Sequence, residues 1–466
     1  MCQLQNDWED TYSLAEQTIT KATRKDPAKD YEAYFSSFET IEVNIRNSEI
    51  LTQNKIVDSG VGIRAIVDEQ LGFSCCNKIE QKAFDETLEN AITVAKFSRK
   101  DPDTSFPQST KGISIKELYD SKFEDITIDE IIELAKQAID TAEDYDKRVT
   151  VKSGRIILQR GFRGLINSNG INTNEKGTKM VFYIGGGGQQ ANEVTGGCYE
   201  SKVSRKYHLE PEKMGEKLAK NIVSMFGKKK VDEFNGPALF ASDSVSYQML
   251  NVLNEALNAE NVLTQKSAWI NQIGNYVTSE NLTIEDNGIL PGGFSSRNFD
   301  DEGSTSQKTI LVEKGRLRNY LQNTKSANKL KTKSTSNACR SPSSFDLVRS
   351  IIGIGYRAKP EIYPSNIVIE PGENNWKKLL SEIDKGVLIE SMAGFPQKGS
   401  GVISAQLSRA YYIEKGEIQF CLKDAMVSGV VFDWLKQISG ISKDVKEFQN
   451  AILPAIRVED VKIFCG

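Results

Sequence analysis

Histidine is almost absent from the sequence, because the 466 residues include only His208. Zinc peptidases commonly use two histidines on one helix, since imidazoles hold the ion while a neighbouring glutamate activates its water. One imidazole cannot build such a site, and His208, in Tyr207-His208-Leu209, fits an ordinary polar residue at the start of a helix. A site for a hard cation built from carboxylates alone stays open, because such ligands leave little trace in a sequence.

Cysteine patterns and long apolar runs are also missing. The seven cysteines include no CxxC pair, and an odd number in so long a chain is typical of a reducing compartment rather than of a disulfide scaffold. No cationic patch followed by an apolar core opens the sequence, and no run of about 18 apolar residues occurs. We therefore expect a cytoplasmic protein that makes no contact with a membrane.

Motifs for nucleophilic catalysis and phosphate binding are absent as well. A Ser-His-Asp or Cys-His arrangement would have to use the single histidine, and no GxSxG elbow surrounds a serine. Ser400, between two glycines, fits a turn. The run Gly185–Gly188 lacks the GxxxxGK(S/T) spacing, so we interpret it as a flexible turn or a close backbone approach rather than as an anion-binding loop.

Neither sign of charge dominates. The 59 basic and 63 acidic residues give a net charge of −4, and the two signs are interspersed. The densest basic stretches, Lys228–Lys230 and Lys325–Lys333, fit solvated loops or helix ends. Without a broad basic face, nucleic acid is not expected as a partner.

Length and composition indicate a folded protein of two or three domains. Single cores stop growing at roughly 250 to 300 residues, and this chain is longer. Hydrophobic residues make up 39% of it, enough for packed interiors. We expect an N-terminal α+β domain over 1–100, a central α+β domain over 113–230 and a β-rich C-terminal domain over 235–466.

Periodicity gives the elements of the first two domains. In the first, apolar residues recur at helical spacing over 10–25 and 80–98 and alternate with polar residues over 41–45 and 61–67, which predicts antiparallel strands. In the second, helices are expected over 127–144, with Thr127 and Glu130 as a capping box, and over 209–226. Strand candidates between them are 149–151, 156–159, 164–168 and 179–184.

The third domain has short strand candidates separated by turns. Helices are expected to interrupt them over 244–259 and 376–385. The strand candidates are 310–312, 367–369, 387–390, 410–413 and 418–420. The fold class is therefore α+β, with strand-and-helix domains first and a larger β-rich domain last.

The most distinctive local sequence is the acidic loop, Phe299–Gly303, with three carboxylates in a row. Such a run is usually solvated. If it is buried, the carboxylates need backbone N–H donors or cations, which Arg297, Arg316 or Arg318 could supply. The residues alone leave both interpretations open.

Several motifs, in order along almost the whole chain, resemble the TldD/PmbA family. They are Ser59–Arg64, Leu282–Asp286, the acidic loop, Gly315–Leu317 with Tyr320-Leu321, Ser326-Ala327, Ser334–Asn337, Ile369–Gly372, Gly386–Ile389 and Tyr412–Ile418. The order of these motifs makes the resemblance more specific than any one of them.

The resemblance implies a subunit without a metal site of its own. In that family the TldD-like subunit carries an HExxxH helix and a further cysteine ligand near its C-terminus, and it pairs with a PmbA-like (TldE-like) subunit that lacks them. In the matching helix here, Leu250 and Glu255 stand about where the imidazoles would be and Asn251 about where the glutamate would be. Cys465 has no recognisable family motif around it. No catalytic residue and no metal ligand is therefore assigned, and zinc is expected in the partner.

The function implied by the resemblance is to form one wall of a chamber in which a TldD-like partner cleaves unfolded peptides. The protein is then expected to be inactive alone and to bind peptide through β-rich walls. The substrate-binding residues suggested by the motifs are Asp300, Asp301, Glu302, Gly303 and Asn337.

Three alternatives remain. The chain could be a stand-alone peptide- or ligand-binding protein of the same fold, without a role in proteolysis. It could be an enzyme with a carboxylate-bound metal near Asp300, Asp301 and Glu302. Members of the family are also described as modulators of DNA gyrase, although the acidic balance of this chain gives no physical support for DNA contact.

Overall fold

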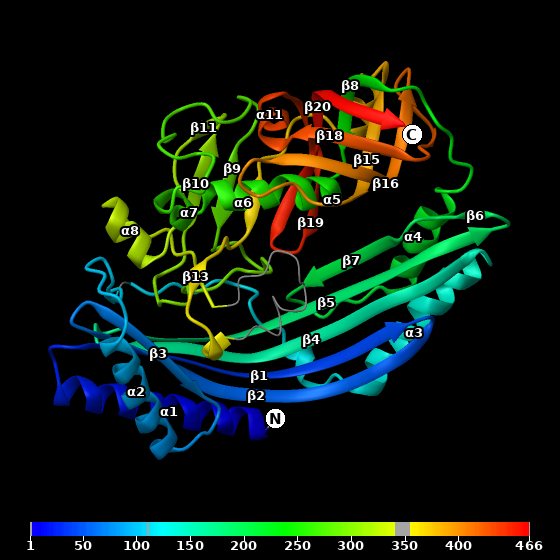
Figure 1. Cartoon of the computed structure of the whole chain (residues 1–466). Coiled ribbons are helices and arrows are strands. Elements are labelled where there is room, and N and C mark those ends of the chain that lie inside the picture. Colours follow the sequence, from blue (N-terminus) through cyan, green and yellow to red (C-terminus); the bar gives the residue numbers. More distant parts are fainter. Residues whose placement is uncertain (1, 110, 341–354, 466) are drawn as a thin grey trace.

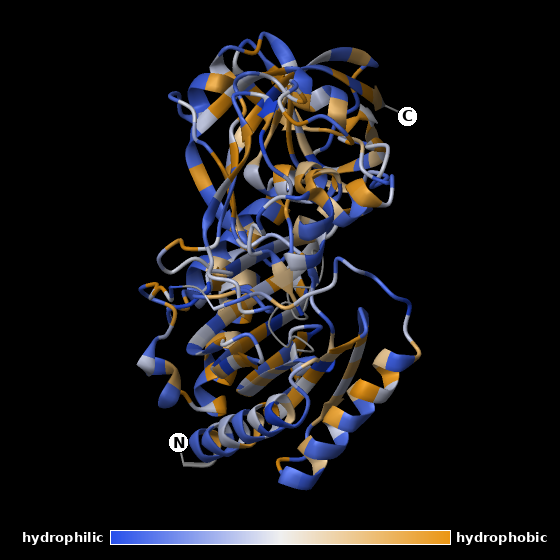
Figure 2. Cartoon of the chain, turned by 90° about the vertical axis from the view of Figure 1, so that its left-hand side faces the viewer, coloured by the Kyte–Doolittle hydropathy of each residue, from blue (hydrophilic) through white to orange (hydrophobic). Residues whose placement is uncertain are grey.

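The computed structural model describes residues 2–109, 111–340 and 355–465, which form two lobes. The lower lobe in Figure 1 is built on very long strands with helices beneath them, and the upper lobe is a β-rich body that contains the C-terminus. Figure 2 shows the same two lobes, one above the other, from the side. The predicted α+β class, with the β-rich region last, is confirmed.

One antiparallel sheet spans the lower lobe, in the order β3-β2-β1-β4-β5-β6, with β7 also paired to β5. Its strands are β1 (Asp30–Arg46), β2 (Glu49–Val67), β3 (Gln70–Cys76), β4 (Val149–Asn167), β5 (Asn172–Gln190), β6 (Glu193–Val194) and β7 (Cys198–Ser204). Strands β1 and β4 pair from Glu32 opposite Asn167 to Arg46 opposite Ser153. Strands β1 to β3, from the first hundred residues, and strands β4 to β7, from residues 149–204, therefore form one continuous sheet.

The two faces of this sheet have different neighbours. The odd-numbered apolar residues of β1 are buried against helices, in keeping with the period of two along a strand; they are Tyr31, Ala33, Phe35, Ile41, Val43 and Ile45. These helices are α1 (Cys2–Lys25), α2 (Gln81–Lys96), α3 (Ile128–Tyr145) and α4 (Pro211–Val223). Even-numbered Glu32 and Tyr34 lie on the opposite face, where Tyr34 packs with Phe299. That inner face is turned toward the upper lobe.

Local sequence accounts for the helix boundaries. The Thr127 hydroxyl accepts a hydrogen bond from the Glu130 amide at 3.2 Å, so the predicted cap begins α3. Pro211 occupies the first turn of α4, where its missing N–H costs no hydrogen bond. Hydrophobic and hydrophilic residues share the helices of the lower lobe, as Figure 2 shows, and their apolar residues face the sheet.

Two glycine-containing segments were predicted as strand or close approach correctly but with the wrong extent or an added turn. The three short strands expected over 149–168 are the single strand β4, and the run Gly185–Gly188 is the buried end of strand β5 rather than a turn. Glycine serves close packing in both places: a Cβ on Gly161 would lie 2.2 Å from the Ser37 carbonyl oxygen. The alternative of a close backbone approach was right, since a Cβ on Gly186 would lie 2.5 Å from the Thr150 oxygen.

An 11-stranded sheet forms the upper lobe, in the order β11-β10-β9-β14-β20-β18-β16-β15-β8, with β17 paired to β16 and β19 to β20. Its strands are β8 (Phe234–Phe240), β9 (Ile284–Asn287), β10 (Lys308–Glu313), β11 (Arg316–Leu317), β14 (Ile367–Ile369), β15 (Lys385–Ala393), β16 (Val402–Glu414), β17 (Glu417–Cys421), β18 (Ala425–Val430), β19 (Ile438–Phe448) and β20 (Ala451–Cys465). All five short strand candidates of this region fall on these strands.

Helical segments and a small two-stranded sheet complete the upper lobe. The small sheet pairs β12 (Ala338–Cys339) with β13 (Glu361–Ile362). The helices are α5 (Ser242–Val245), α6 (Asn251–Leu257), α7 (Ala259–Leu263), α8 (Thr324–Leu330), α10 (Trp376–Ser381) and α11 (Val431–Lys436). A π-helical turn, Ser246–Leu250, joins α5 to α6, so the helix expected over 244–259 is continuous as far as Leu257, and the extended backbone of Asn258 separates it from α7.

Replacing Gly161 by alanine should lower the free energy of unfolding by on the order of 1–3 kcal/mol, because the new methyl group cannot fit without moving the neighbouring strand. Urea unfolding of the purified variant measures the loss. Gly112→Ala is the matched control, because a Cβ there meets no atom within 4 Å. Equal stabilities of the two variants would contradict the close approach of β1 and β4.

Candidate functional site

The acidic loop lies between the two lobes and is buried. Asp300, Asp301 and Glu302 are at most 5% exposed, so the interpretation as a solvated loop is wrong and the buried alternative holds. Of the three nearby arginines, only Arg297 faces these carboxylates. Arg318 pairs instead with Glu313, and Arg316 stacks over Tyr276.

Arg163 on the inner face of β4 holds Asp301. One guanidinium nitrogen pairs with the carboxylate of Asp301, another donates to the Phe299 carbonyl at 2.6 Å, and Nε donates to Glu175 at 2.7 Å. The guanidinium also lies 4.7 Å from the centre of the Phe299 ring. Arg163, a residue of the lower lobe, thus contacts both a backbone carbonyl and a side-chain carboxylate of the acidic loop.

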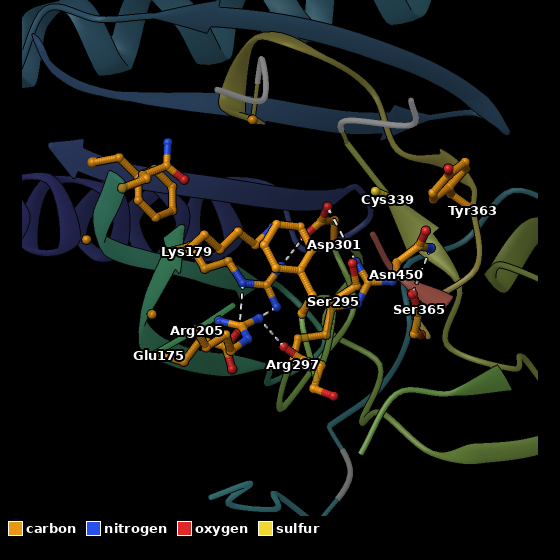
Figure 3. Close-up of a pocket in the computed structure, with 18 of the residues that line it drawn as sticks. Glu175, Lys179, Arg205, Ser295, Arg297, Asp301, Cys339, Tyr363, Ser365 and Asn450 are labelled. Carbon is orange, nitrogen blue, oxygen red and sulfur yellow. Dashed lines mark hydrogen bonds and ion pairs between the residues drawn. The ribbon is translucent and has the colours of Figure 1, made fainter. Parts of the chain in front are cut away.

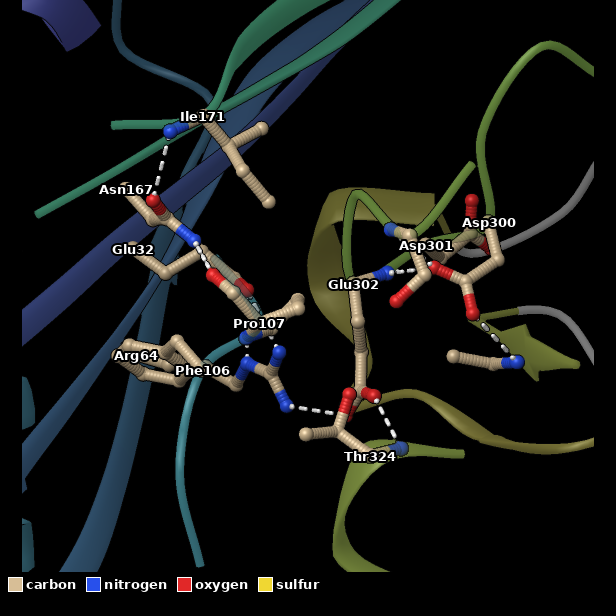
Figure 4. Close-up of polar contacts among 12 residues, drawn as sticks. Glu32, Arg64, Phe106, Pro107, Asn167, Ile171, Asp300, Asp301, Glu302 and Thr324 are labelled. Atoms are coloured by element: carbon tan, nitrogen blue, oxygen red, sulfur yellow. Dashed lines mark hydrogen bonds and ion pairs between the residues drawn. The ribbon is translucent and has the colours of Figure 1, made fainter. Parts of the chain in front are cut away.

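Glu302 reaches a second arginine, Arg64 on β2, as Figure 4 shows. Arg64 Nη1 lies 3.2 Å from Glu302 Oε1, while its Nε and Nη2 form a bidentate pair with Glu32 on β1 at 2.7 and 2.6 Å. The other oxygen of Glu302 accepts the Thr324 amide at the start of α8. Glu302 therefore links a helix of the upper lobe to the sheet of the lower lobe.

Arg340 completes the arrangement with no measurable exposure. Its Nη2 donates to Glu32 at 2.7 Å, its backbone amide donates to Asp301 at 2.6 Å, and its Nη1 donates to the Ala358 carbonyl at 2.7 Å. We call these side chains the interlobe ion network. Its members are Glu32, Arg64, Arg163, Glu175, Asp301, Glu302 and Arg340.

Asp300 and Gly303 shape the loop itself. Asp300 accepts the backbone amides of Glu302, Ser304 and Ala338 at 2.9–3.1 Å. Burial, followed by repulsion from Glu302, raises the pKa of Asp300. Gly303 has φ +86°, a conformation that residues with a side chain rarely adopt, and it closes the turn.

Asn337 belongs to a separate buried cluster around Asp286 on β9. Its Nδ2 donates to Asp286 Oδ2 at 2.7 Å, and the Ser365 amide donates to Asp286 Oδ1 at 2.6 Å. Burial raises the pKa of Asp286 to about 6 against the lowering effect of these hydrogen bonds. The five residues suggested for substrate binding thus have partners inside the protein, and their contact with a peptide stays a prediction.

A cavity of about 150 Å³ lies beside the interlobe ion network. The lower lobe contributes the inner face of β4 and β5, Tyr34 and Phe38 of β1, and Arg205 just after β7, and the upper lobe contributes the remaining walls (Figure 3). The polar and charged residues that line it include Gln159, Arg163, Glu175, Lys179, Arg205, Ser295, Arg297, Asp301, Cys339, Ser365 and Asn450. We call this space the interlobe cavity.

The sequence analysis found only Asp301 of this set as a site residue, and named Arg297 as a cation for the acidic loop. The other basic residues stand far apart in the sequence and meet through strand register, with Gln159 opposite Lys179 and Arg163 opposite Glu175. Their only signal is that Gln159 and Arg163, and likewise Glu175 and Lys179, flank a glycine on the strand face away from the helices. That signal becomes readable once the pairing of β4 and β5 is known.

The basic residues of the cavity affect one another. The pKa of Lys179 is lowered to about 7, first by burial and then by the nearby positive charge of Arg205. Arg163 and Arg297 lower it further by smaller amounts. Burial also lowers the pKa of Arg205 to about 10.

The helix that matches the metal-binding helix of TldD-like chains lies elsewhere in the upper lobe. Leu250 and Asn251 are buried there, and Asn251 donates a hydrogen bond to the Tyr247 carbonyl. Glu255 pairs with Lys398 at 2.8 Å and accepts a hydrogen bond from Asn261. Within 2–109, 111–340 and 355–465, no group of three or more His, Cys, Asp or Glu side chains could hold a metal ion.

His208 is exposed just before α4, where its Nε2 lies 3.4 Å from Glu210. The lysines of the 325–333 run are surface residues, two of which pair with Asp101 at 2.9 Å. None of the helices that the structure describes has the length and apolar character needed to cross a membrane.

Three family models match the chain in order. They describe PmbA/TldA metallopeptidase domain 1 over 31–95, the central domain over 121–226 and the C-terminal domain over 235–464. The architecture described above, together with these matches, defines a protein of the metallopeptidase-related class built from these three domains. The chain belongs to the TldD/PmbA family, and its fold is that of a TldE-like member.

Individual relatives agree with this assignment. The chain is similar to an uncharacterised protein of Methanocaldococcus jannaschii, with 27% identity over 90% of this chain and 95% of that protein. It is also similar to a metalloprotease PmbA homologue of Buchnera aphidicola, with 23% identity over 91% and 90% of the two chains. The crystal structure of TldE from Thermococcus kodakarensis superimposes with a TM-score of 0.86, 23% identity and coverage of 97% and 100%.

Replacing Glu302 by glutamine should lower the free energy of unfolding by on the order of 3 kcal/mol, because one partner of a buried ion pair is removed and Arg64 keeps its charge. Urea unfolding measures the effect. Glu86→Gln is the control, because its pair with Lys82 is exposed and should contribute less than about 0.5 kcal/mol. A small loss in both variants would mean that Glu302 does not join the lobes.

The stability of Asp286→Asn relative to the unmodified protein should depend on pH. The folded-state pKa of Asp286 is raised above its unfolded value, so its stabilising contribution is fully present below about pH 4 and is lost as pH rises through about 6. The unmodified protein should therefore gain roughly 3 kcal/mol relative to the variant between pH 8 and pH 4, since a tenfold change in acidity constant corresponds to about 1.4 kcal/mol. Urea unfolding of both proteins across this range checks the prediction, which parallel pH profiles would contradict.

Proposed function

We propose that this protein is a subunit of a two-chain peptidase complex in the cytoplasm and carries no metal site of its own. It forms one wall of a chamber that holds unfolded peptides. A TldD-like partner supplies the zinc ion and the water that cleaves the peptide bond. In this complex the chain described here has no cofactor, no catalytic residue and no contact with nucleic acid or membrane.

The observation that carries the proposal is the combination of a complete family architecture with an altered helix. All three domains of the family are matched. At the positions that correspond to the HExxxH ligands, a leucine is packed in the core and a glutamate is paired with Lys398. Asn251 has no carboxylate with which to activate a water molecule. These residues support a role in shape and binding rather than in metal chemistry.

The interlobe ion network supports a rigid wall. Its charges pair across the lobes, so the relative position of the two sheets depends on contacts made within one chain. An extended peptide could pair with a strand edge of such a wall through its backbone, which suits unfolded substrates of varied sequence. In this proposal Asp300, Asp301, Glu302, Gly303 and Asn337 belong to the peptide-binding wall, and their contacts inside the chain hold that wall in place.

The proposal predicts that proteolysis requires both subunits. A TldD-like chain from the same genome should copurify with this protein. A mixture of the two should cleave a fluorescently labelled unfolded peptide at least about tenfold faster than the partner alone, whereas this chain alone should show no cleavage above buffer. A chelator should abolish the activity of the mixture, since the zinc ion is held by the partner.

Two controls make the result decisive. A partner variant with glutamine in place of the glutamate of HExxxH should still copurify but should not cleave. Cleavage by this chain alone at the rate of the mixture would overturn the proposal. Failure of the two chains to associate, with full activity of the partner alone, would instead favour the stand-alone binding protein.

A further inference from the structure

The long strand β2 borders the sheet of the lower lobe, and its outer side is paired for only part of its length (Figure 1). Its neighbour β3 pairs with residues 61–67 of β2. Residues 49–60 pair with β1 on one side, and no strand in the described part of the chain pairs with their other side. The backbone N–H and C=O groups on that side can therefore pair with a further strand. We call residues 50–59 the open edge.

The side chains of the open edge are exposed on both faces of the sheet. Every residue from Leu51 to Val57 is exposed, whereas the helices of the lower lobe cover Ile41 and Val43 on the neighbouring strand. Three of the exposed side chains are large and apolar, with exposed fractions of 57% for Leu51, 49% for Ile56 and 39% for Val57. Apolar area on this strand is thus left for a contact outside the chain's own fold.

The open edge has few of the features by which proteins prevent unwanted strand pairing. No proline occurs in residues 49–60, and the only charged residue between Ile50 and Val57 is Lys55. That lysine is drawn toward Glu39 of β1, at 3.1 Å. The one irregularity in the pairing of β2 with β1 lies at Ile50–Thr52, at the start of the edge. The rest of the open edge is a regular strand that can receive another.

We propose that the open edges of two copies of this chain pair antiparallel about a twofold axis, so that the two lower-lobe sheets become one sheet across a homodimer. A twofold axis brings the same surface of each copy together, so the strand meets its own sequence in reverse. Side chains alternate between the faces of a sheet, and residues directly opposite each other point to the same face. Opposite residues must therefore both be even-numbered or both be odd-numbered, and the axis passes through one residue.

The exposed side chains place this axis at Asn54. Leu51 then lies opposite Val57 and Thr52 opposite Ile56, and each pair occurs twice because of the symmetry. Pairs of aliphatic and β-branched residues are favourable across antiparallel strands. This register covers all three exposed apolar residues of the open edge, and it sets no two like charges opposite each other.

The neighbouring registers are less favourable. An axis at Lys55 would set this lysine directly opposite its own copy, and like charges in that position are destabilising. An axis at Gln53 would set Lys55 opposite Leu51 and would centre the contact close to the irregularity at Ile50–Thr52. The match of the strand with its own reverse is what indicates a second copy as the occupant. The inference goes beyond the proposed function, because it needs neither a TldD-like chain nor a peptide.

The test is sedimentation equilibrium of the purified chain without a partner, from about 1 to about 200 μM protein. A strand-edge contact is small, so the dimer should be weak, with a dissociation constant below about 50 μM. Ile56→Lys should raise this constant at least tenfold, because each copy then places an ammonium group in the apolar part of the contact. Val94→Lys is the matched control, since Val94 is an exposed valine of α2 with a similar exposed fraction, 47%, and its replacement should leave the constant unchanged.

A second substitution tests the register. Thr52→Glu added to Ile56→Lys should restore the dissociation constant to within about threefold of the original value, because each introduced carboxylate faces the introduced ammonium group of the other copy. Within one chain these positions are four residues apart on a strand, roughly 13 Å, so the rescue must act between copies. Thermal unfolding at low concentration should show that the single and double variants are folded.

Three results would overturn the proposal. The first is a monomer at every concentration, including a monomer that uses this edge only to bind a TldD-like chain. The second is a dimer that Ile56→Lys leaves intact. The third is a weakened dimer that Thr52→Glu does not restore.

Discussion

Asp301 and Glu302 are carried by the upper lobe and meet Arg163 and Arg64, which project from the sheet of the lower lobe. Charges taken out of water are expensive, and their mutual attraction offsets this cost only when each is paired and hydrogen-bonded. Here each carboxylate has both a guanidinium and a backbone N–H donor. Such contacts tolerate little displacement, so they define one relative position of the lobes even where their net contribution to stability is modest.

The interlobe cavity is a consequence of the same arrangement. Among the residues that the structure describes, the carboxylates of Glu175 and Asp301 line this cavity, and both pair with Arg163. The inner face of the sheet could have been filled with apolar residues, as its outer face is. Instead its middle carries Gln159, Arg163, Glu175 and Lys179 beside Gly161 and Gly177, and burying such polar groups costs stability unless each is hydrogen-bonded or paired.

Sequence reasoning succeeded where neighbours along the chain determine structure. The alternation of Ile41, Val43 and Ile45 and the cap at Thr127 depend on local periodicity and hydrogen bonding, and both were predicted correctly. It could not decide whether the acidic loop was buried, because Arg64 and Arg163 lie 238 and 138 positions away from their partners. The nearby Arg316 and Arg318 were plausible alternatives, but Arg316 on β11 stacks over Tyr276 and Arg318 pairs with Glu313. The cavity was missed for the same reason, since register rather than spacing assembles it.

The pairing of β1 with β4 also bears on how the chain can be made. Strand β1 can pair with β4 only after residues 153–167 have been synthesised. Until then, the edge of β1 that faces away from β2 is long, partly apolar and unpaired. Contacts so distant in sequence slow the search for the native topology. A fragment that ends near residue 100 would present this edge permanently, and it should aggregate rather than behave as a small soluble protein.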